Sequence, residues 1–240
     1  MCQVLRLQGE KTINDALEAF FRTEYGQSMT QETSGFLAER LERLMPPVCL
    51  GLGYLPPYAD GHKEAFKNTF WLVNRALRAS PWPEDEESAR ALVADEYLLP
   101  FENESVDTVL VLHSLEFTPH YIDSTLREIW RVLKAGGRIF IVTARKFGLL
   151  PFVAGDLFTW SKLWPEFLLN RKLANAGFER ITSTKIADFS NKPNEAALFR
   201  LWGKCYKNVL VLEAQKVVAS PIGLAQTPLN GRLGPVGTFN

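Results

Sequence analysis

The sequence predicts a single α/β domain built on an open, mostly parallel β-sheet. Three consecutive segments carry this prediction. Residues 106–112 form an apolar run rich in Val and Leu, which is typical of a strand buried on both faces of a parallel sheet. Leu126, Ile129 and Leu133 then recur at helical spacing, and residues 138–143 form a second apolar run. A strand, a crossover helix and a strand in this order make a βαβ unit.

The length and the charge balance limit the classes of protein that fit this chain. Its 240 residues are enough for one sizeable core. Hydrophobic residues make up 46% and charged residues 22%, a balance typical of globular domains in water. Lys plus Arg and Asp plus Glu number 27 each, so no basic excess indicates a nucleic-acid surface. A nucleic-acid partner is therefore disfavoured.

The cysteines and the hydropathy pattern predict a cytoplasmic protein. Cys2, Cys49 and Cys205 are odd in number and include no CxxC pair, which disfavours both a disulfide framework and a zinc site. Reduced thiols are the simplest interpretation. No apolar run reaches the roughly 18 residues of a membrane-spanning helix. The first residues also lack the basic start and apolar core of a signal peptide.

The chain divides into three predicted regions. Residues 1–46 hold two N-terminal helices, within residues 12–45, that break at Tyr25–Gln27. These helices either pack only on the sheet or also place the loop at Tyr25–Gln27 near the first turn of the sheet. Residues 47–216 form the main domain. Residues 217–240, where Gly and Pro recur with little to bury, are predicted to be a disordered tail.

The remaining segments fit further elements of the same sheet. Strands are expected at residues 48–50, 70–73, 91–94 and 178–187, and an antiparallel edge strand at residues 208–213. Helices are expected at residues 58–66, 166–176 and 195–206. Gly136 and Gly137 are expected to end the crossover helix, because glycine accepts the left-handed backbone of a helix C-terminus. Asp107 is expected to bond backbone within the sheet.

Polar side chains follow three of the predicted strands. Asn74 follows the second strand, Asp95 and Glu96 the third, and His113 and Glu116 the fourth. In an open α/β sheet, ligands bind in the crevice at the carboxyl ends of the strands. His113 is a candidate general base, since imidazole exchanges protons near neutral pH. A structural role for His113 is an equally open interpretation.

The turn after the first strand, Gly51-Leu52-Gly53-Tyr54, lets a ligand approach the backbone closely. It does not match a dinucleotide fingerprint. Such a site needs GxGxxG and an acidic residue after the second strand, and Asn74 stands at that second position. A nicotinamide-dependent oxidoreductase is therefore disfavoured.

A longer string of residues gives a more specific indication. It consists of an apolar turn, a polar loop, a Val-Asp pair that opens a strand, a helix and a glycine pair. The matching residues are Leu99-Pro100-Phe101, Val106-Asp107, Leu126, Glu128, Arg131-Val132-Leu133-Lys134 and Gly136-Gly137. Over about residues 45–145 the chain resembles class I S-adenosylmethionine (SAM) dependent methyltransferases, in the type 11-like, small-molecule branch. It is also similar to a bacterial subfamily whose first loop reads GLGY and is followed by proline.

The resemblance implies a fold, a cofactor and a reaction. It implies a Rossmann-like, doubly wound sheet of seven strands with helices on both faces. It also implies methyl transfer from SAM to an O, N or C atom of a small-molecule acceptor, with no metal required. The implied cofactor-binding residues are Gly51, Gly53, Tyr54, Asn74, Asp95, Glu96 and His113, and His113 is also the implied catalytic residue. Residues 147–168, which are rich in Phe and Trp, either line an acceptor pocket or pack on the core.

The chain departs from the family pattern at the cofactor loop. Leu55 replaces the third glycine, Cys49 replaces an acidic residue, and Asn74 replaces the acid that usually binds the ribose. These departures support a second hypothesis, in which the fold has lost catalysis and serves as a binding or scaffolding module. A crevice filled by the protein's own side chains favours that hypothesis, and an open crevice favours the enzyme.

Overall fold

The computed structural model describes residues 13–73, 91–146, 161–186 and 207–218. Within this part of the chain, seven strands form one sheet in the order β3-β2-β1-β4-β5-β7-β6. The strands are β1 (Cys49–Gly53), β2 (Thr69–Val73), β3 (Ala91–Val93), β4 (Val106–Leu112), β5 (Leu133–Ala144), β6 (Phe178–Ile186) and β7 (Val209–Lys216). Strands β1 to β5 pair in parallel, and β7 runs antiparallel to both of its neighbours. The predicted seven-strand, mostly parallel sheet is therefore confirmed.

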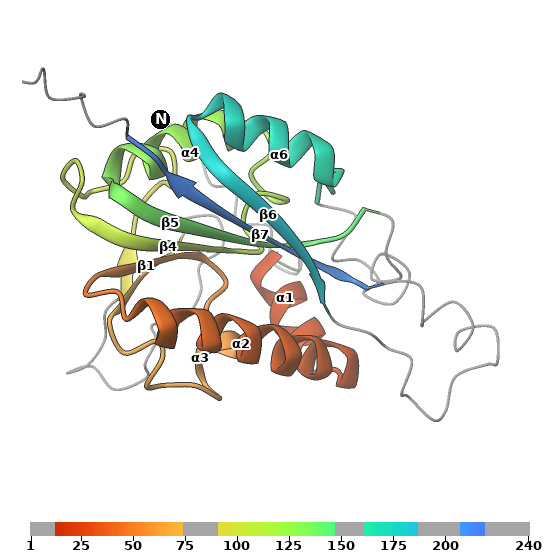
Figure 1. Cartoon of the computed structure of the whole chain (residues 1–240). Coiled ribbons are helices and arrows are strands. Elements are labelled where there is room, and N and C mark those ends of the chain that lie inside the picture. Colours follow the sequence, from red (N-terminus) through yellow and green to blue (C-terminus); the bar gives the residue numbers. More distant parts are fainter. Residues whose placement is uncertain (1–12, 74–90, 147–160, 187–206, 219–240) are drawn as a thin grey trace, which may run out of the picture.

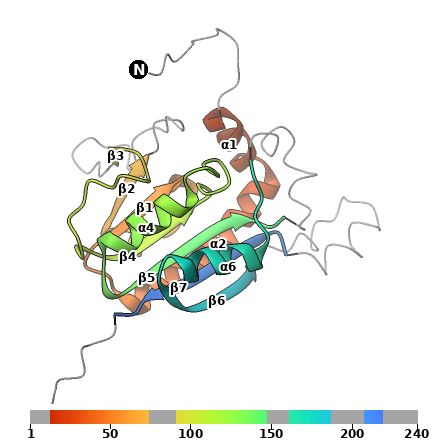
Figure 2. The same ribbon diagram turned by 90° about the horizontal axis from the view of Figure 1, so that it is seen from above.

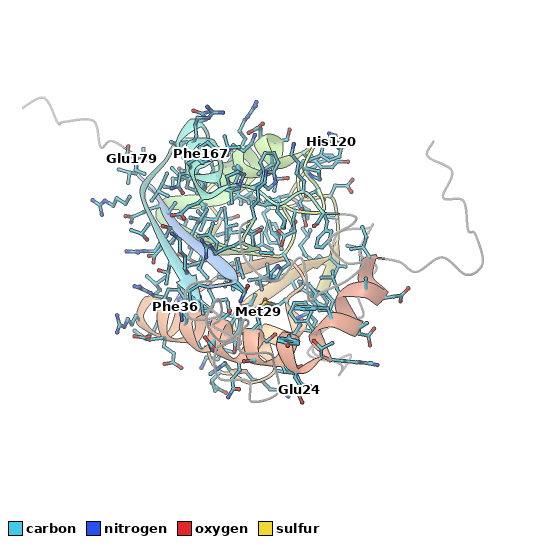
Figure 3. The ribbon with its side chains drawn as sticks, turned by 90° about the vertical axis from the view of Figure 1, so that its right-hand side faces the viewer. Glu24, Met29, Phe36, His120, Phe167 and Glu179 are labelled. Carbon is cyan, nitrogen blue, oxygen red and sulfur yellow. The ribbon has the colours of Figure 1, made fainter. Side chains whose placement is uncertain are left out.

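Helices cover both faces of the sheet, as the sequence predicts. They are α1 (Ile13–Phe21), α2 (Glu24–Leu44), α3 (Pro56–Ala59), α4 (Ile122–Val132) and α6 (Glu166–Asn175). Figures 1 and 2 show α1, α2 and α3 on one face and α4 and α6 on the other. Side chains of α2 follow this arrangement, with Met29 turned toward the sheet and Glu24 on the outer side (Figure 3). No described helix is both long and apolar enough to cross a membrane.

The strand β4 is apolar from Val109 to Leu112 because both of its faces are covered. Leu110 and Leu112 belong to the core cluster under α1 and α2, whereas Val109 and Val111 belong to the cluster under α4 and α6. Alternate residues of a strand point to opposite faces, so a sheet covered on both faces buries every position. The predicted βαβ unit thus forms the centre of the fold.

The break between the N-terminal helices lies earlier than the sequence predicts. It falls at Arg22 and Thr23, and Tyr25–Gln27 lies inside the first turn of α2, not in a loop. The Thr23 hydroxyl accepts a hydrogen bond from the Gly26 amide at 3.1 Å, which makes Thr23 the N-cap. A Cβ on Gly26 would lie 2.2 Å from the Phe20 carbonyl oxygen, so glycine here lets the two helices meet closely.

The end of the crossover helix also differs from the prediction. Helix α4 ends at Val132, and Leu133 already pairs with Val106 as the first residue of β5. The glycine pair lies within β5, where the register with β4 shifts, and Gly136 has a φ of +80°. The glycines therefore make a bulge in a strand instead of a helix cap.

Two further predictions are corrected by the sheet and its first crossover. The expected helix at residues 58–66 shrinks to the four residues of α3, and turns follow it to Phe66. Strand β7 is expected at the edge but lies between β5 and β6, and β6 forms the edge. Asn74, the expected helix at residues 195–206 and the tail from residue 219 lie outside the described residues.

A partly buried ion pair between Arg131 and Glu128 of α4 holds the apolar turn Leu99–Phe101 against this helix. Arg131 donates to the backbone oxygen of Leu99 at 3.0 Å and that of Phe101 at 2.9 Å. Glu128 accepts from the Leu99 amide at 3.1 Å and from Arg131 at 2.8 Å, and this pairing with Arg131 lowers the pKa of Glu128. The two side chains thus fix the loop that follows Glu96. Asp107 plays a similar part, since it accepts from the Val48 amide at 3.0 Å, as expected.

Arg131→Lys is expected to lower the free energy of unfolding by about 1–3 kcal/mol, because one ammonium cannot serve two carbonyls and a carboxylate with the geometry of a guanidinium. Urea unfolding followed by circular dichroism measures the change. Arg127→Lys is the matched control, since Arg127 is exposed on the same helix, and its effect should stay within about 0.5 kcal/mol. Equal effects of the two substitutions would contradict the role of Arg131.

Candidate active site

The first turn of the sheet is held by its neighbours. Gly53 has a φ of +88°, and a Cβ there would lie 2.2 Å from the Leu112 carbonyl oxygen. The same oxygen accepts a hydrogen bond from the Tyr54 amide at 2.8 Å. The indole nitrogen of Trp71 donates to the Gly53 carbonyl at 2.7 Å. Residues of β2 and β4 thus position the end of β1, and only glycine fits there.

Side chains of the protein fill the space on one side of this turn. Leu55, at the third glycine position of the family pattern, is fully buried. Its terminal carbons lie 3.4 and 3.6 Å from the point that a Cβ on Gly51 would occupy. The ring of Tyr54 stacks on Phe21 of α1 with 5.2 Å between ring centroids. Helix α1 therefore lies against the carboxyl end of β1.

A chain of hydrogen bonds follows β4. The Tyr58 hydroxyl donates to Nε2 of His113 at 2.6 Å, and Nδ1 of His113 donates to Glu116 Oε1 at 2.8 Å. This arrangement places the imidazole proton on Nδ1, opposite the carboxylate. The Thr143 hydroxyl donates to the second oxygen of Glu116 at 3.1 Å. All four side chains are buried, so β4, β5 and α3 share one enclosed polar network.

The backbone at His113 adds a second unusual feature to this network. His113 has a φ of +47°, in the left-handed region that residues other than glycine seldom adopt. Its amide donates to the Val142 carbonyl at 3.0 Å, which holds the residue at the end of β4. Such a conformation costs free energy and persists only where surrounding contacts enforce it. The side chain is thereby directed toward Tyr58 and Glu116.

Glu96 forms a second buried polar group beside the first. Its Oε2 accepts hydrogen bonds from the hydroxyls of Ser114 and, at 3.4 Å, Thr118. Its Oε1 is buried and has no hydrogen-bond partner in the described structure. Burial raises the pKa of Glu96 to about 7, against the lowering effect of the two hydroxyls, and the charge of Glu116 raises it further. Glu96 Oε1 can therefore accept a hydrogen bond from a ligand.

Burial also governs the other titratable groups near the turn. It raises the pKa of Tyr58 well above its usual value, and the charge of Glu116 adds to this effect. The Tyr58 hydroxyl therefore keeps its proton and remains a donor to His113. Burial likewise raises the pKa of Cys49 to about 12, so that its thiol stays protonated. Cys49 does not substitute for the acidic residue of the family pattern.

The structure brings several predicted site residues together and leaves others apart. Glu96 contacts Ser114, the neighbour of His113, although β3 and β4 are separated in the sheet by β2 and β1. Gly53 and Tyr54 adjoin the same end of β4 through Leu112. Asp95 is half-buried, and its charge contributes to the raised pKa of Glu96. Asn74 lies outside the described residues.

Four residues of the network escaped the sequence analysis. Ser114, Thr118 and Thr143 could have been found, because they lie at or just beyond the carboxyl ends of predicted strands. Tyr58 gave no such signal. It is distant from His113 in the sequence, and its contact depends on how the short helix α3 packs.

Comparisons with known proteins agree with this architecture. Residues 70–141 match a family model described as a methyltransferase domain. No curated protein matches the chain by sequence. Among solved structures, the complex between the Haloferax volcanii Trm112 methyltransferase activator and a putative methyltransferase shows 18% identity and a TM-score of 0.61, over 87% of this chain and 99% of that one.

Two other structures share the fold and differ in the reactions for which they are named. Geranyl diphosphate C-methyltransferase from Streptomyces coelicolor, solved with S-adenosyl-L-homocysteine, shows 14% identity and a TM-score of 0.55, over 77% of this chain and 78% of that one. The [4+2]-cyclase SpnF shows 18% identity and a TM-score of 0.57, over 82% of this chain and 84% of that one. At such identities the likeness establishes the fold alone.

The described residues can be tested against the cofactor of this family. SAM carries hydrogen-bond donors on its adenine and ribose, and Glu96 Oε1 is a buried acceptor without a partner. Gly53 provides a turn with no side chain at the crevice. Leu55 narrows the space beside Gly51. The Glu96 carboxylate, by contrast, suits the hydrogen-bond donors of the cofactor. The seven-strand sheet has the fold of class I SAM-dependent methyltransferases, and residues 70–141 match a methyltransferase domain.

Proposed function

We propose that this protein transfers the methyl group of SAM to a small organic acceptor. The observation that carries the proposal is the pair of polar groups at the carboxyl ends of the strands, Glu96 with its orphan oxygen and His113 with its carboxylate partner. When bound, SAM supplies a methyl group on a positively charged sulfur. The acceptor forms a bond to that carbon as the carbon–sulfur bond breaks, and an O–H or N–H acceptor also releases a proton.

In this proposal the residues of the chain align the reactants and exclude water. Glu96 accepts a hydrogen bond from the adenine or ribose end of the cofactor, and Asp95 accepts one from the adenine amino group. Gly53 lets the cofactor approach the backbone. Tyr54, with Phe21 against its ring, limits the access of water to the turn.

His113 is the proposed base for the acceptor proton. Glu116 holds the imidazole in the tautomer that leaves Nε2 free of a proton, which is the form that a base requires. The Tyr58 hydroxyl occupies that nitrogen. The acceptor proton therefore reaches His113 in one of two ways. The Tyr58 hydroxyl relays the proton to Nε2, or the acceptor displaces this hydroxyl and bonds to Nε2 itself. We further propose a small-molecule partner, a cytoplasmic location and a bacterial type of enzyme, on the charge balance, the cysteine pattern and the GLGY turn.

Asp95→Ala is expected to weaken SAM binding at least tenfold, equivalent to about 1.4 kcal/mol, because the adenine loses an acceptor. Calorimetric titration of the wild type with SAM, S-adenosylhomocysteine and NAD should show binding of the first two only. Glu102→Ala is the matched control, since Glu102 is an exposed acid in the same loop. Unchanged affinity of the Asp95 variant would remove Asp95 from the site.

A second function is favoured by one observation. Leu55 fills the space beside Gly51, where the family pattern has glycine in its place. A protein of this fold with a closed crevice serves as a binding or scaffolding module. Failure of the wild type to bind SAM or S-adenosylhomocysteine would favour this function over methyl transfer, and the search would turn to protein partners.

A further inference from the structure

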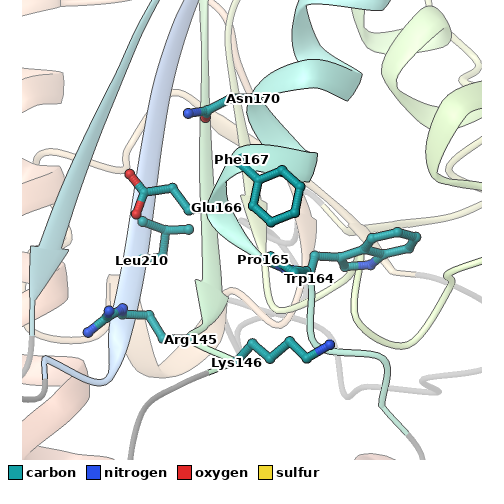
Figure 4. Close-up of a pocket in the computed structure, with 8 residues that line it drawn as sticks. All are labelled: Arg145, Lys146, Trp164, Pro165, Glu166, Phe167, Asn170 and Leu210. Atoms are coloured by element: carbon teal, nitrogen blue, oxygen red, sulfur yellow. The ribbon is translucent and has the colours of Figure 1, made fainter.

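A cavity of about 350 Å³ lies beyond the carboxyl end of β5, at the N-terminus of α6 (Figure 4). Its volume falls within the range of roughly 300–1,000 Å³ that small-molecule sites occupy. Arg145 and Lys146 reach it from the end of β5, and Leu210 from β7. The methyl-transfer site described above does not include these residues.

One end of the cavity carries positive charge. Arg145 donates through Nη1 to the Lys207 carbonyl at 2.6 Å, and its other guanidinium nitrogens remain available to a ligand. Lys146 is exposed and forms no ion pair with the residues that the structure describes. Figure 4 shows both side chains at the end of the cavity opposite Asn170. Their charged ends point in opposite directions, so the guanidinium of Arg145 is the group that can bind a carboxylate through two oxygens, and Lys146 adds positive charge to this end.

The acid in the cavity wall does not cancel this charge. Glu166 accepts a hydrogen bond from the Ser183 hydroxyl at 2.5 Å and pairs with Lys185 at 3.1 Å. The Ser183 bond, with Lys185 and Arg145 nearby, lowers the pKa of Glu166, so that it is ionised at neutral pH. Lys185 supplies its counter-charge. With Lys185 as the main partner of Glu166, Arg145 and Lys146 leave this end of the cavity with a net positive charge.

The middle of the cavity is apolar. Phe167 exposes 67% of its surface and lies between the cationic end and Asn170 (Figure 4). Trp164 and Leu210 form the deeper wall, and both are buried. An exposed ring beside such a wall provides a stacking surface for a flat apolar body.

The far end of the cavity lacks a hydrogen-bond donor. Oδ1 of Asn170 is buried and has no partner in the described structure. An unmet acceptor costs free energy, which a hydroxyl or amine of a ligand recovers. The cavity is thus suited to a ligand with an anionic group at one end, a flat apolar body in the middle and a hydrogen-bond donor at the other end.

The wall of the cavity is joined to the loop that carries the proposed base. The Trp164 indole donates to the Leu115 carbonyl at 3.3 Å, and the Lys162 amide donates to the Glu116 carbonyl at 2.7 Å. A ligand against Trp164 therefore adjoins the segment from His113 to Glu116. These two hydrogen bonds join the wall of the cavity to the loop beside the proposed methyl-transfer site.

We propose that this cavity binds a hydroxylated aromatic carboxylate, with its carboxylate on Arg145 at the end that Lys146 also makes positive, its ring on Phe167 and its hydroxyl toward Asn170. Resting on the proposed methyl transfer, we further propose that the cavity anchors the acceptor by groups other than the atom that takes the methyl group. The binding itself does not depend on SAM. It can therefore be tested in the absence of the cofactor.

Saturation-transfer NMR and calorimetry with 4-hydroxybenzoate test the proposal on the full chain. The wild type should bind this probe, and should bind its neutral methyl ester and plain benzoate at least tenfold more weakly. Arg145→Gln with Lys146→Gln should weaken binding of the probe at least tenfold, and Asn170→Leu should remove the preference for it over benzoate. The matched control removes two exposed cations elsewhere, Arg43→Gln with Lys67→Gln, and should leave the affinity unchanged.

Each result has a defined meaning. No binding of the probe to the wild type up to about 10 mM, or equal binding to the Arg145 and Lys146 variant, would overturn the site. A separate titration with SAM separates the two proposals. Probe binding without SAM binding removes methyl transfer but keeps the anion site, and SAM binding without probe binding removes the anion site alone.

Discussion

In the wild type, titration of Glu96 is expected to lower the free energy of unfolding by about 3 kcal/mol as the pH rises from 4.5 to about 7. The Glu96→Gln variant is expected to lack this decrease. The pKa of Glu96 is about 7 in the fold and starts from a value of 4.5. Between these values the folded protein keeps a proton that the unfolded chain has released. Stability is therefore fully present below pH 4.5, falls as the pH rises and is lowest above about 7. An amide does not titrate, so the variant lacks this fall.

Urea unfolding at intervals from pH 4 to 8 measures the effect as the difference between the two proteins. The contributions of the other carboxyl groups to the pH dependence are the same in both proteins and cancel in this difference. Glu128 is one of them, and its lowered pKa gives a contribution of the opposite sign. Glu102→Gln, at an exposed position of the same loop, should run parallel to the wild type. A parallel curve for the Glu96 variant as well would show that this carboxyl titrates normally.

Gly53→Ala is expected to destabilise the protein by about 3 kcal/mol or more. The backbone there has a φ of +88°, which costs an L-residue about 1–2 kcal/mol. The added carbon would also lie 2.2 Å from the Leu112 carbonyl oxygen, and a backbone atom cannot step aside as a side chain can. The turn must move, and SAM binding should weaken with it.

Gly35→Ala is the matched control for this substitution. Gly35 lies inside α2, and a Cβ there would meet nothing within 4 Å. Alanine should therefore stabilise the helix by about 0.5–1 kcal/mol, because it lowers the entropy of the unfolded chain. Thermal unfolding of both variants checks the pair. A loss at Gly53 no larger than the change at Gly35 would show that the turn is not constrained as described.

Much of the fold was predictable because burial leaves a pattern in the sequence. Within Val106–Leu112, the residues from Val109 onward are all apolar because both faces of β4 are covered. Boundaries set by tertiary contacts were not predictable in the same way. Gly136 and Gly137 are consistent with a helix end, and only the pairing of Leu133 with Val106 shows that the strand has already begun. The position of β7 between β5 and β6 likewise depends on which strands pair, and the sequence of β7 alone does not indicate its neighbours.

The candidate site was predictable where position alone decides it. Glu96 and His113 follow strands, and the carboxyl ends of parallel strands meet at one edge. The hydrogen-bond partners were not predictable, because they come from segments far apart in the chain. Tyr58 reaches His113 through α3, and Glu96 reaches Ser114 across the ends of two intervening strands. The cavity beside α6 depends in the same way on β5, α6 and β7 together.

The place of β7 has a consequence for synthesis on the ribosome. Among the described strands, β6 pairs only with β7, which comes later in the chain, and one edge of β5 is covered by the same strand. A nascent chain that has emerged only as far as Ile186 thus carries one strand without a neighbour and one bare edge. Both are templates for pairing with other chains until Val209–Lys216 arrives. Among the described strands, the last to be made is therefore the one that covers the edge of β5 and gives β6 its neighbour.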